Sequence, residues 1–154
     1  MSAVSDPRGG VGQRVFVDTN VLVYAYDLSA GEKHERARDL VEELWRTRYG
    51  CVSVQVLQEF FVNVPRKIPK PLSTAQAKEI VSDLSYWKLH SPTGRDVVEA
   101  IDLNERHELS FWDSMIVRSA VSLGCNMVLT EDLNPGQAYD GLTVENPFQG
   151  HPGT

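Results

Sequence analysis

The chain has 154 residues, of which 42% are hydrophobic and 23% are charged. This length fits one domain and allows a core that needs neither a metal nor a disulfide to fold. The formal net charge of −6 argues against broad electrostatic binding to nucleic acid, although a substrate could still be reached through bound cations. No apolar run approaches the ~20 residues of a membrane span, so we expect a soluble protein.

The ends and the cysteines point to an intracellular protein. Residues 1–13 are rich in glycine and lack the apolar stretch of a signal peptide, so we expect a flexible tail and a cytoplasmic location. The two cysteines, Cys51 and Cys125, each adjoin an apolar run and lack the spacing of a zinc site. They are expected to be buried free thiols in a reducing compartment.

The first informative stretch is an apolar run that is interrupted by three polar residues. Val15 to Val17 are typical of a strand buried on both faces, and Asp18 follows at its carboxyl end. Thr19 or Asn20 can cap a following helix. Ligands of open α/β sheets bind at such turns. Taken alone, Asp18 could equally be only a cap or turn residue.

The next segments alternate between helix and strand. Residues 32–48 have the spacing of an amphipathic helix, which Gly50 is expected to end, and residues 51–54 form a second strand. Residues 55–64 have helical spacing with Glu59 among apolar neighbours. A carboxylate there is costly to bury, so Glu59 either binds a cation or forms a structural salt bridge. Residues 65–71 indicate a basic loop, and the role of Arg66 to Lys70 stays open.

Two further helices flank a third strand. Ser73 opens a helix with a capping box, residues 86–90 form a strand, and a helix follows from Thr93 to about residue 105. In this last helix we expect Val97, Ala100 and Ile101 to face inward. No pairing of serine, histidine and aspartate is evident from the sequence.

The last part of the chain contributes two more acids. Ser110 can cap a buried helix through residue 123, with Asp113 in its first turn. Either the helix dipole or a cation could explain a carboxylate at that position. Residues 126–130 form a fourth strand that ends just before Glu131 and Asp132, and residues 142–144 form a short fifth strand.

This alternation predicts an α/β fold with a parallel sheet and helices on both faces. In such a sheet four acids converge at one edge, namely Asp18, Glu59, Asp113 and Asp132. They would repel one another strongly unless a hard divalent cation lies among them. The sequence therefore predicts binding of Mg²⁺ or Mn²⁺.

The segments that carry these acids are similar to the four motifs of PIN-domain ribonucleases. They are residues 16–22, Ser53 with Glu59, residues 109–114 and residues 129–133. The closest resemblance is to the VapC-type toxins of toxin-antitoxin pairs, and it spans about Arg14 to Pro147. It implies a single PIN-like domain at 14–147 between tails at 1–13 and 148–154, with strand order 3-2-1-4-5. In that order the two cysteines would lie about two strand spacings (~9.6 Å) apart.

The resemblance also implies roles for individual residues. Asp18, Glu59, Asp113 and Asp132 would form the catalytic cluster, in which Asp18, Asp113 and Asp132 hold the metal. The residues that support this cluster would be Thr19, Asn20, Ser114 and Thr130. The implied activity is metal-dependent hydrolysis of RNA, leaving a 5′-phosphate and a 3′-hydroxyl, with Glu59 orienting water or helping to hold a second ion. The implied partners are a cognate antitoxin and a second copy of the chain.

A housekeeping PIN nuclease and a non-catalytic metal-binding or nucleotide-binding module remain the alternatives. A phosphotransfer receiver domain would need paired acids at the first strand and a lysine near the fifth. A phosphatase of the haloacid dehalogenase type needs aspartate where this chain has Asn20.

Overall fold

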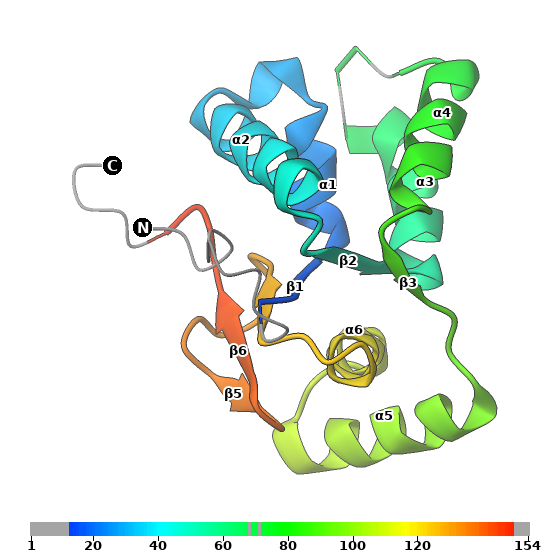
Figure 1. Cartoon of the computed structure of the whole chain (residues 1–154), viewed down its shortest axis with the longest axis vertical. Helices are drawn as coiled ribbons and strands as arrows, with labels where there is room; N and C mark the ends of the chain where they lie inside the picture. Colours follow the sequence, from blue (N-terminus) through cyan, green and yellow to red (C-terminus); the bar gives the residue numbers. More distant parts are fainter. Residues whose placement is uncertain (1–12, 68, 71, 150–154) are drawn as a thin grey trace.

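The structure is a computed structural model, and it describes residues 13–67, 69–70 and 72–149. A twisted sheet lies at the centre, with helices α1 to α4 on one side and α5 and α6 on the other (Figure 1). The expected α/β architecture with a mostly parallel sheet is confirmed. Within the described ranges no helix is long and apolar enough to cross a membrane.

The sheet has six strands in the order β3-β2-β1-β4-β6-β5. Their bounds are β1 Val15–Val17, β2 Gly50–Ser53, β3 Lys88–His90, β4 Met127–Leu129, β5 Ala138–Tyr139 and β6 Leu142–Glu145. The five parallel strands reproduce the expected order, with β6 in the fifth place. We had not expected β5, which pairs antiparallel with β6. The turn between them has positive φ at both Asp140 (49°) and Gly141 (87°), as a tight hairpin requires.

The register aligns the carboxyl ends of the central strands at one edge. Val17 lies opposite Leu129, and Phe16 lies opposite both Cys51 and Val128. Since parallel strands share a direction, the residues that follow β1, β2 and β4 emerge together. Asp18, the start of the helix after β2, and Thr130 therefore meet at this edge.

The helices begin and end close to where the sequence predicts. Their bounds are α1 Thr19–Ala25, α2 Glu32–Thr47, α3 Val54–Lys67, α4 Thr74–Leu84, α5 Gly94–His107 and α6 Phe111–Ser122, with a short 3-10 helix η1 at Leu28–Ala30. The capping box at Ser73 and the cap at Ser110 are both formed. The cap of α1 is Asp18, which is one of the two roles that the sequence left open for it, and not Thr19 or Asn20.

Two helix ends differ from the expectation. Arg48, in the left-handed conformation with φ 63°, ends α2. Gly50, which we had expected to end it, lies in β2, where a Cβ would come within 2.6 Å of the Trp87 ring. Helix α3 continues through Pro65 to Lys67, so the first part of the expected loop is helical. Proline in the last turn removes one backbone hydrogen bond but does not prevent the turn from forming.

The buried face of α5 also differs from the expected one. Ala100 is buried as expected, but Val97 and Ile101 are 37% and 45% exposed.

Both cysteines are buried and free. The Cys51 thiol donates to the Tyr49 carbonyl at 3.6 Å, and interaction with the other thiol lowers the pKa of Cys51 and raises that of Cys125. The expected separation of two strand spacings concerns the backbones alone, and it stays a prediction.

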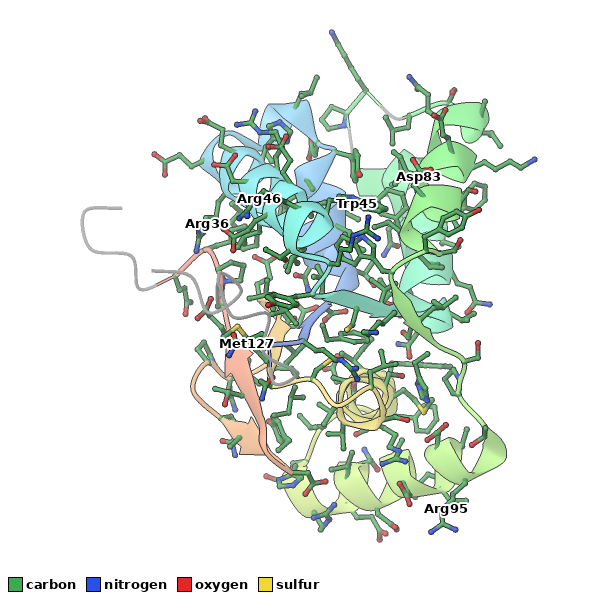
Figure 2. The ribbon with its side chains drawn as sticks, viewed as in Figure 1. Arg36, Trp45, Arg46, Asp83, Arg95 and Met127 are labelled. Atoms are coloured by element: carbon green, nitrogen blue, oxygen red, sulfur yellow. The ribbon has the colours of Figure 1, made fainter. Side chains whose placement is uncertain are left out.

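The chain remains packed into the expected C-terminal tail. The ring of Phe148 contacts that of Tyr24 edge to face, with centroids 5.1 Å apart. Arg36 on α2 donates from Nε to the carbonyl of Pro147 at 3.3 Å, and Figure 2 shows Arg36 beside the segment that follows β6. The tails expected at 1–13 and 148–154 otherwise lie outside the described residues, apart from Gln13 and Gln149.

Candidate active site

Asp18 is held at the turn between β1 and α1. Its Oδ1 accepts from the backbone N–H of Thr19 at 2.7 Å, and its Oδ2 accepts from the Thr130 hydroxyl at 2.8 Å. The Asp18 backbone N–H donates to the Leu129 carbonyl at 3.0 Å, which continues the pairing of β1 with β4. The carboxylate is only 4% exposed. It is thus both a helix cap and a member of the candidate site.

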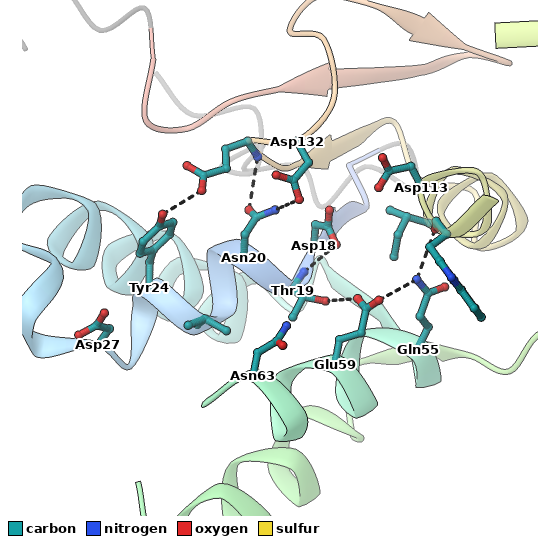
Figure 3. Close-up of a pocket in the computed structure, with 14 residues that line it drawn as sticks. Asp18, Thr19, Asn20, Tyr24, Asp27, Gln55, Glu59, Asn63, Asp113 and Asp132 are labelled. Atoms are coloured by element: carbon teal, nitrogen blue, oxygen red, sulfur yellow. Dashed lines mark hydrogen bonds between the residues drawn. The ribbon is translucent and has the colours of Figure 1, made fainter. Parts of the chain in front are cut away.

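Asn20 connects α1 to the segment that follows β4. Its Nδ2 donates to Asp132 Oδ2 at 2.9 Å and to Thr130 Oγ1 at 3.2 Å, while its Oδ1 accepts from the Glu131 backbone at 3.3 Å. Figure 3 shows the Asn20 amide pointing toward Asp132, with Asp18 beside it. The amide therefore sets the position of Asp132 relative to Asp18.

Glu59 reaches the site from α3, with both carboxylate oxygens bonded. Oε1 accepts from the Thr19 hydroxyl at 2.7 Å, and Oε2 accepts from Gln55 Nε2 at 3.2 Å. The same Gln55 nitrogen lies 3.3 Å from the Trp112 carbonyl on α6. Within the described residues Glu59 has no basic partner. The salt-bridge interpretation of this carboxylate is thereby excluded for that part of the chain.

Asp113 lies in the first turn of α6, across the cavity from Asn20 (Figure 3). Ser110 caps this helix by accepting from the Asp113 backbone at 3.1 Å. Ser114, which we expected to support the acids, is fully buried and donates to the Ser110 carbonyl at 2.9 Å. It stabilises the start of α6 and makes no hydrogen bond to any of the four acids in the described structure.

All four predicted acids line one cavity of about 380 Å³. Its walls also include residues that the sequence did not single out, namely Val23, Tyr24, Asp27, Gln55, Asn63, Trp112, Ile116 and Glu131. Six carboxylates line the cavity, and among the side chains that the structure describes no lysine, arginine or histidine does so. Gln55, Glu59 and Asn63 recur every four residues on α3, and this spacing could have identified the two amides from the sequence.

The electrostatics of the cavity follow from this crowding of acids. Burial raises the pKa of Asp18 to about 7, against hydrogen bonds from Thr19 and Thr130 that lower it. The charges of Asp132 and Glu59 raise it further. Burial likewise raises the pKa of Asp113, again with contributions from Asp132 and Glu59. The charges of Asp132 and Glu59 therefore act on both Asp18 and Asp113.

The donor set suits a hard divalent cation, since carboxylate oxygens are the ligands that Mg²⁺ and Mn²⁺ prefer. The raised pKa values of two acids, with no basic side chain among the lining residues, indicate a deficit of positive charge. In the part of the chain that the structure describes, however, no three acids are already grouped closely enough to hold a metal. The residues fit the ion by chemistry and charge, and their side chains would have to draw together around it.

A second polar cluster joins strand β3 to helices α5 and α6. His90 bonds through Nδ1 to the Ser119 hydroxyl at 2.8 Å and through Nε2 to Asp96 at 3.2 Å. Asp96 also accepts from Arg118 at 2.9 Å, and hydrogen bonds from Thr93 lower its pKa to about 2. No local pattern in the sequence indicated this arrangement of serine, histidine and aspartate. Ser119 is completely buried, so the cluster joins β3, α5 and α6 and cannot act on a substrate.

Comparison with known proteins agrees with this geometry. The family model of the PIN domain matches residues 15–140. No curated protein matches the chain significantly.

Several solved structures share the fold. A toxin-antitoxin complex from Klebsiella pneumoniae superimposes with a TM-score of 0.62 at 17% identity, covering 88% of this chain and 98% of that one. DNA-bound VapBC from Salmonella typhimurium gives 0.61 at 18% identity, covering 87% and 98%. VapC20 of Mycobacterium tuberculosis, a toxin that cleaves the sarcin-ricin loop, gives 0.56 at 19% identity, covering 74% and 86%. At these identities the likeness establishes the fold.

Proposed function

Because the chain belongs to the PIN-domain family, we propose that it is a metal-dependent endoribonuclease and the toxin of a toxin-antitoxin pair. One observation carries the proposal. Asp18, Glu59, Asp113 and Asp132 come from four separate segments and line one cavity, in which no described side chain is basic. A purely structural arrangement would pair these acids with lysine or arginine.

In this proposal Asp18, Asp113 and Asp132 hold Mg²⁺ or Mn²⁺. A bound divalent cation supplies charge neutralisation at the scissile phosphate and acidifies water. The chain's own residues position the groups around it. Thr130 and the Thr19 backbone orient Asp18, and Asn20 orients Asp132.

Glu59 takes the role of a base in the same proposal. Hydrogen bonds from Thr19 and Gln55 fix the direction of its carboxylate. A carboxylate held in this way can accept a proton from the water that attacks phosphorus. In-line attack then breaks the bond to the 3′ oxygen and leaves a 5′-phosphate and a 3′-hydroxyl.

Some of the proposed partners are supported by structures that share the fold. Toxin-antitoxin complexes and VapBC are among them, which supports a protein antitoxin for this chain. The sarcin-ricin loop cleaved by VapC20 is RNA, which supports RNA as the substrate class. A homodimer is also proposed, since Trp45 and Phe61 are 39% and 45% exposed and offer apolar surface. Light scattering of the purified chain measures this directly.

The test of activity uses defined RNAs with Mg²⁺, Mn²⁺ or EDTA. The wild type should cleave only with metal, and Asp113→Asn should lose at least a hundredfold in rate. Asp102→Asn is the matched control, because Asp102 is an exposed aspartate on α5 outside the cavity. Metal binding without cleavage of any RNA would favour the non-catalytic module instead.

The toxin role is tested separately by growth. The chain is expressed alone and together with the neighbouring reading frame. Growth arrest that the second frame relieves is the expected result. If the chain is harmless in cells while the purified protein cleaves RNA, a housekeeping nuclease is the better interpretation.

A further inference from the structure

Trp112 is an exposed aromatic residue in the wall of the acidic cavity. Its side chain is 62% exposed, although large aromatic residues contribute most when they are buried. It belongs neither to the hydrophobic core nor to the partly buried residues packed against it. Its described ring contact is an edge-to-face one with Phe111, at 5.0 Å between centroids. Packing therefore does not account for a tryptophan at this position.

The position of Trp112 is fixed by the same elements that position the acids. It immediately precedes Asp113 in the first turn of α6. Its backbone carbonyl lies 3.3 Å from Gln55 Nε2, which also donates to Glu59. A ligand that reaches Asp113 and Glu59 would therefore pass close to the Trp112 ring.

The charge of the cavity limits how a nucleic acid could be held there. Six carboxylates line it and none of the described lining side chains is basic, so these walls repel a phosphate backbone. Affinity close to the scissile bond must then come from contacts that carry no charge, in addition to any bound cation. The uncharged side chains that line the cavity and could make such contacts include the amides of Asn20, Gln55 and Asn63 and the hydroxyls of Thr19 and Tyr24. The indole of Trp112 also lines the cavity, and it is exposed to solvent.

We propose that the ring of Trp112 stacks on an unpaired nucleobase next to the scissile phosphate and thereby selects single-stranded segments. This inference rests on the proposed nuclease function. Stacking on an exposed aromatic ring is tolerant of base identity, since every base has a π face. It is closed to paired bases, whose faces are already stacked within a helix. Trp112 thus discriminates by the state of the base and not by its hydrogen-bonding edge.

The first test is a double-mutant cycle, in which one change removes the Trp112 ring and the other removes a base of the RNA. Trp112→Ala should raise KM for a single-stranded RNA about 5-fold to 100-fold, the range for loss of one stacked base, with a smaller change in kcat. Trp112→Phe should recover part of the loss. Tyr86→Ala is the matched control, because Tyr86 is 84% exposed and lies outside the cavity. Thermal melting shows that each variant is folded.

An abasic site is then moved along the RNA one position at a time. In the wild type it should lower kcat/KM at one position beside the cleaved bond. In Trp112→Ala the same abasic site should cause no further loss, because the ring and the base are removed from one interaction. An equal abasic penalty in both proteins would overturn the proposal, as would a wild-type KM for Trp112→Ala.

A binding measurement separates this inference from the nuclease proposal. Single-stranded RNA and a perfect duplex of the same sequence are titrated in EDTA, and tryptophan fluorescence is followed. Quenching by the single strand that is absent in Trp112→Phe supports stacking, even if no cleavage is ever found. The wild type could instead cleave RNA without such quenching and without coupling between Trp112 and the abasic site. That result would leave the nuclease proposal intact and would reject the role of Trp112.

Discussion

Replacing Asp18 with asparagine should stabilise the metal-free protein at neutral pH. The folded protein raises the pKa of this carboxyl to about 7, mainly because it is buried, whereas the unfolded value is 3.8. The folded state therefore binds a proton more tightly than the unfolded state between these two values. Stability is greatest at low pH and falls as pH rises through this window, because ionised Asp18 is unfavourable in the fold.

The size of the effect follows from the two pKa values. A difference of about three pKa units corresponds to ~4 kcal/mol lost above pH 7. Asparagine avoids this loss but sacrifices a hydrogen bond. The Thr130 hydroxyl already accepts from Asn20 and Asp132, so it has no free lone pair for a new amide donor. With about 1 kcal/mol subtracted for that bond, Asp18→Asn should be ~2–3 kcal/mol more stable than the wild type at pH 8.

Urea denaturation in EDTA at pH 5 and pH 8 measures this difference. The advantage of Asp18→Asn should shrink by about 2–3 kcal/mol on going from pH 8 to pH 5, where the folded wild type is protonated. Asp102→Asn is the control and should stay within ~0.5 kcal/mol of the wild type at both values. A difference between Asp18→Asn and the wild type that does not change with pH would refute the reasoning.

Three further predictions concern metal, packing and thiols. Millimolar Mg²⁺ or Mn²⁺ should raise the Tm of the wild type by mass action, and Asp113→Asn should remove most of that shift; calorimetry that detects no binding would contradict this. Gly50→Ala should destabilise the fold by about 1–3 kcal/mol in urea titrations, because its Cβ would lie 2.6 Å from Trp87 Cε3, and an unchanged midpoint would disprove the close packing. Cys51 and Cys125 should react with a thiol reagent only after unfolding, and fewer than two free thiols in denaturant would show that they oxidise in place.

The sequence predicts the fold well where hydrophobic patterns are long. The apolar strands β1 and β4 and the amphipathic helix α2 can be predicted from the spacing of their hydrophobic residues. The alternation of strands and helices predicts a parallel sheet, in which the carboxyl ends of β1 and β4 lie at the same edge. The pattern is less informative on surfaces. Val97 and Ile101 suggested the inner face of α5, yet the buried positions include Asp96, because its pairing with Arg118 and Thr93 compensates the burial.

The candidate site was predictable in its acids but not in its connections. Asp18, Glu59 and Asp132 stand out as acids beside apolar runs. The roles of Asn20 and Gln55 depend on which atoms face each other across elements far apart in the chain, and local sequence carries no such information. Ser114 shows the opposite case, since it adjoins an acid in sequence but bonds only within its own helix.

The hydrogen bond between Thr130 and Asp18 joins residues 112 positions apart in the chain. The site therefore has no local precursor. A ribosome must deliver β4 and the residues after it before β1 can pair with β4 and before Asn20 can bind Asp132. Contacts of such long range form late in folding. Nascent, truncated or partly unfolded chains should consequently be inert. Any activity of this protein should arise in a single step, when β4 pairs with β1.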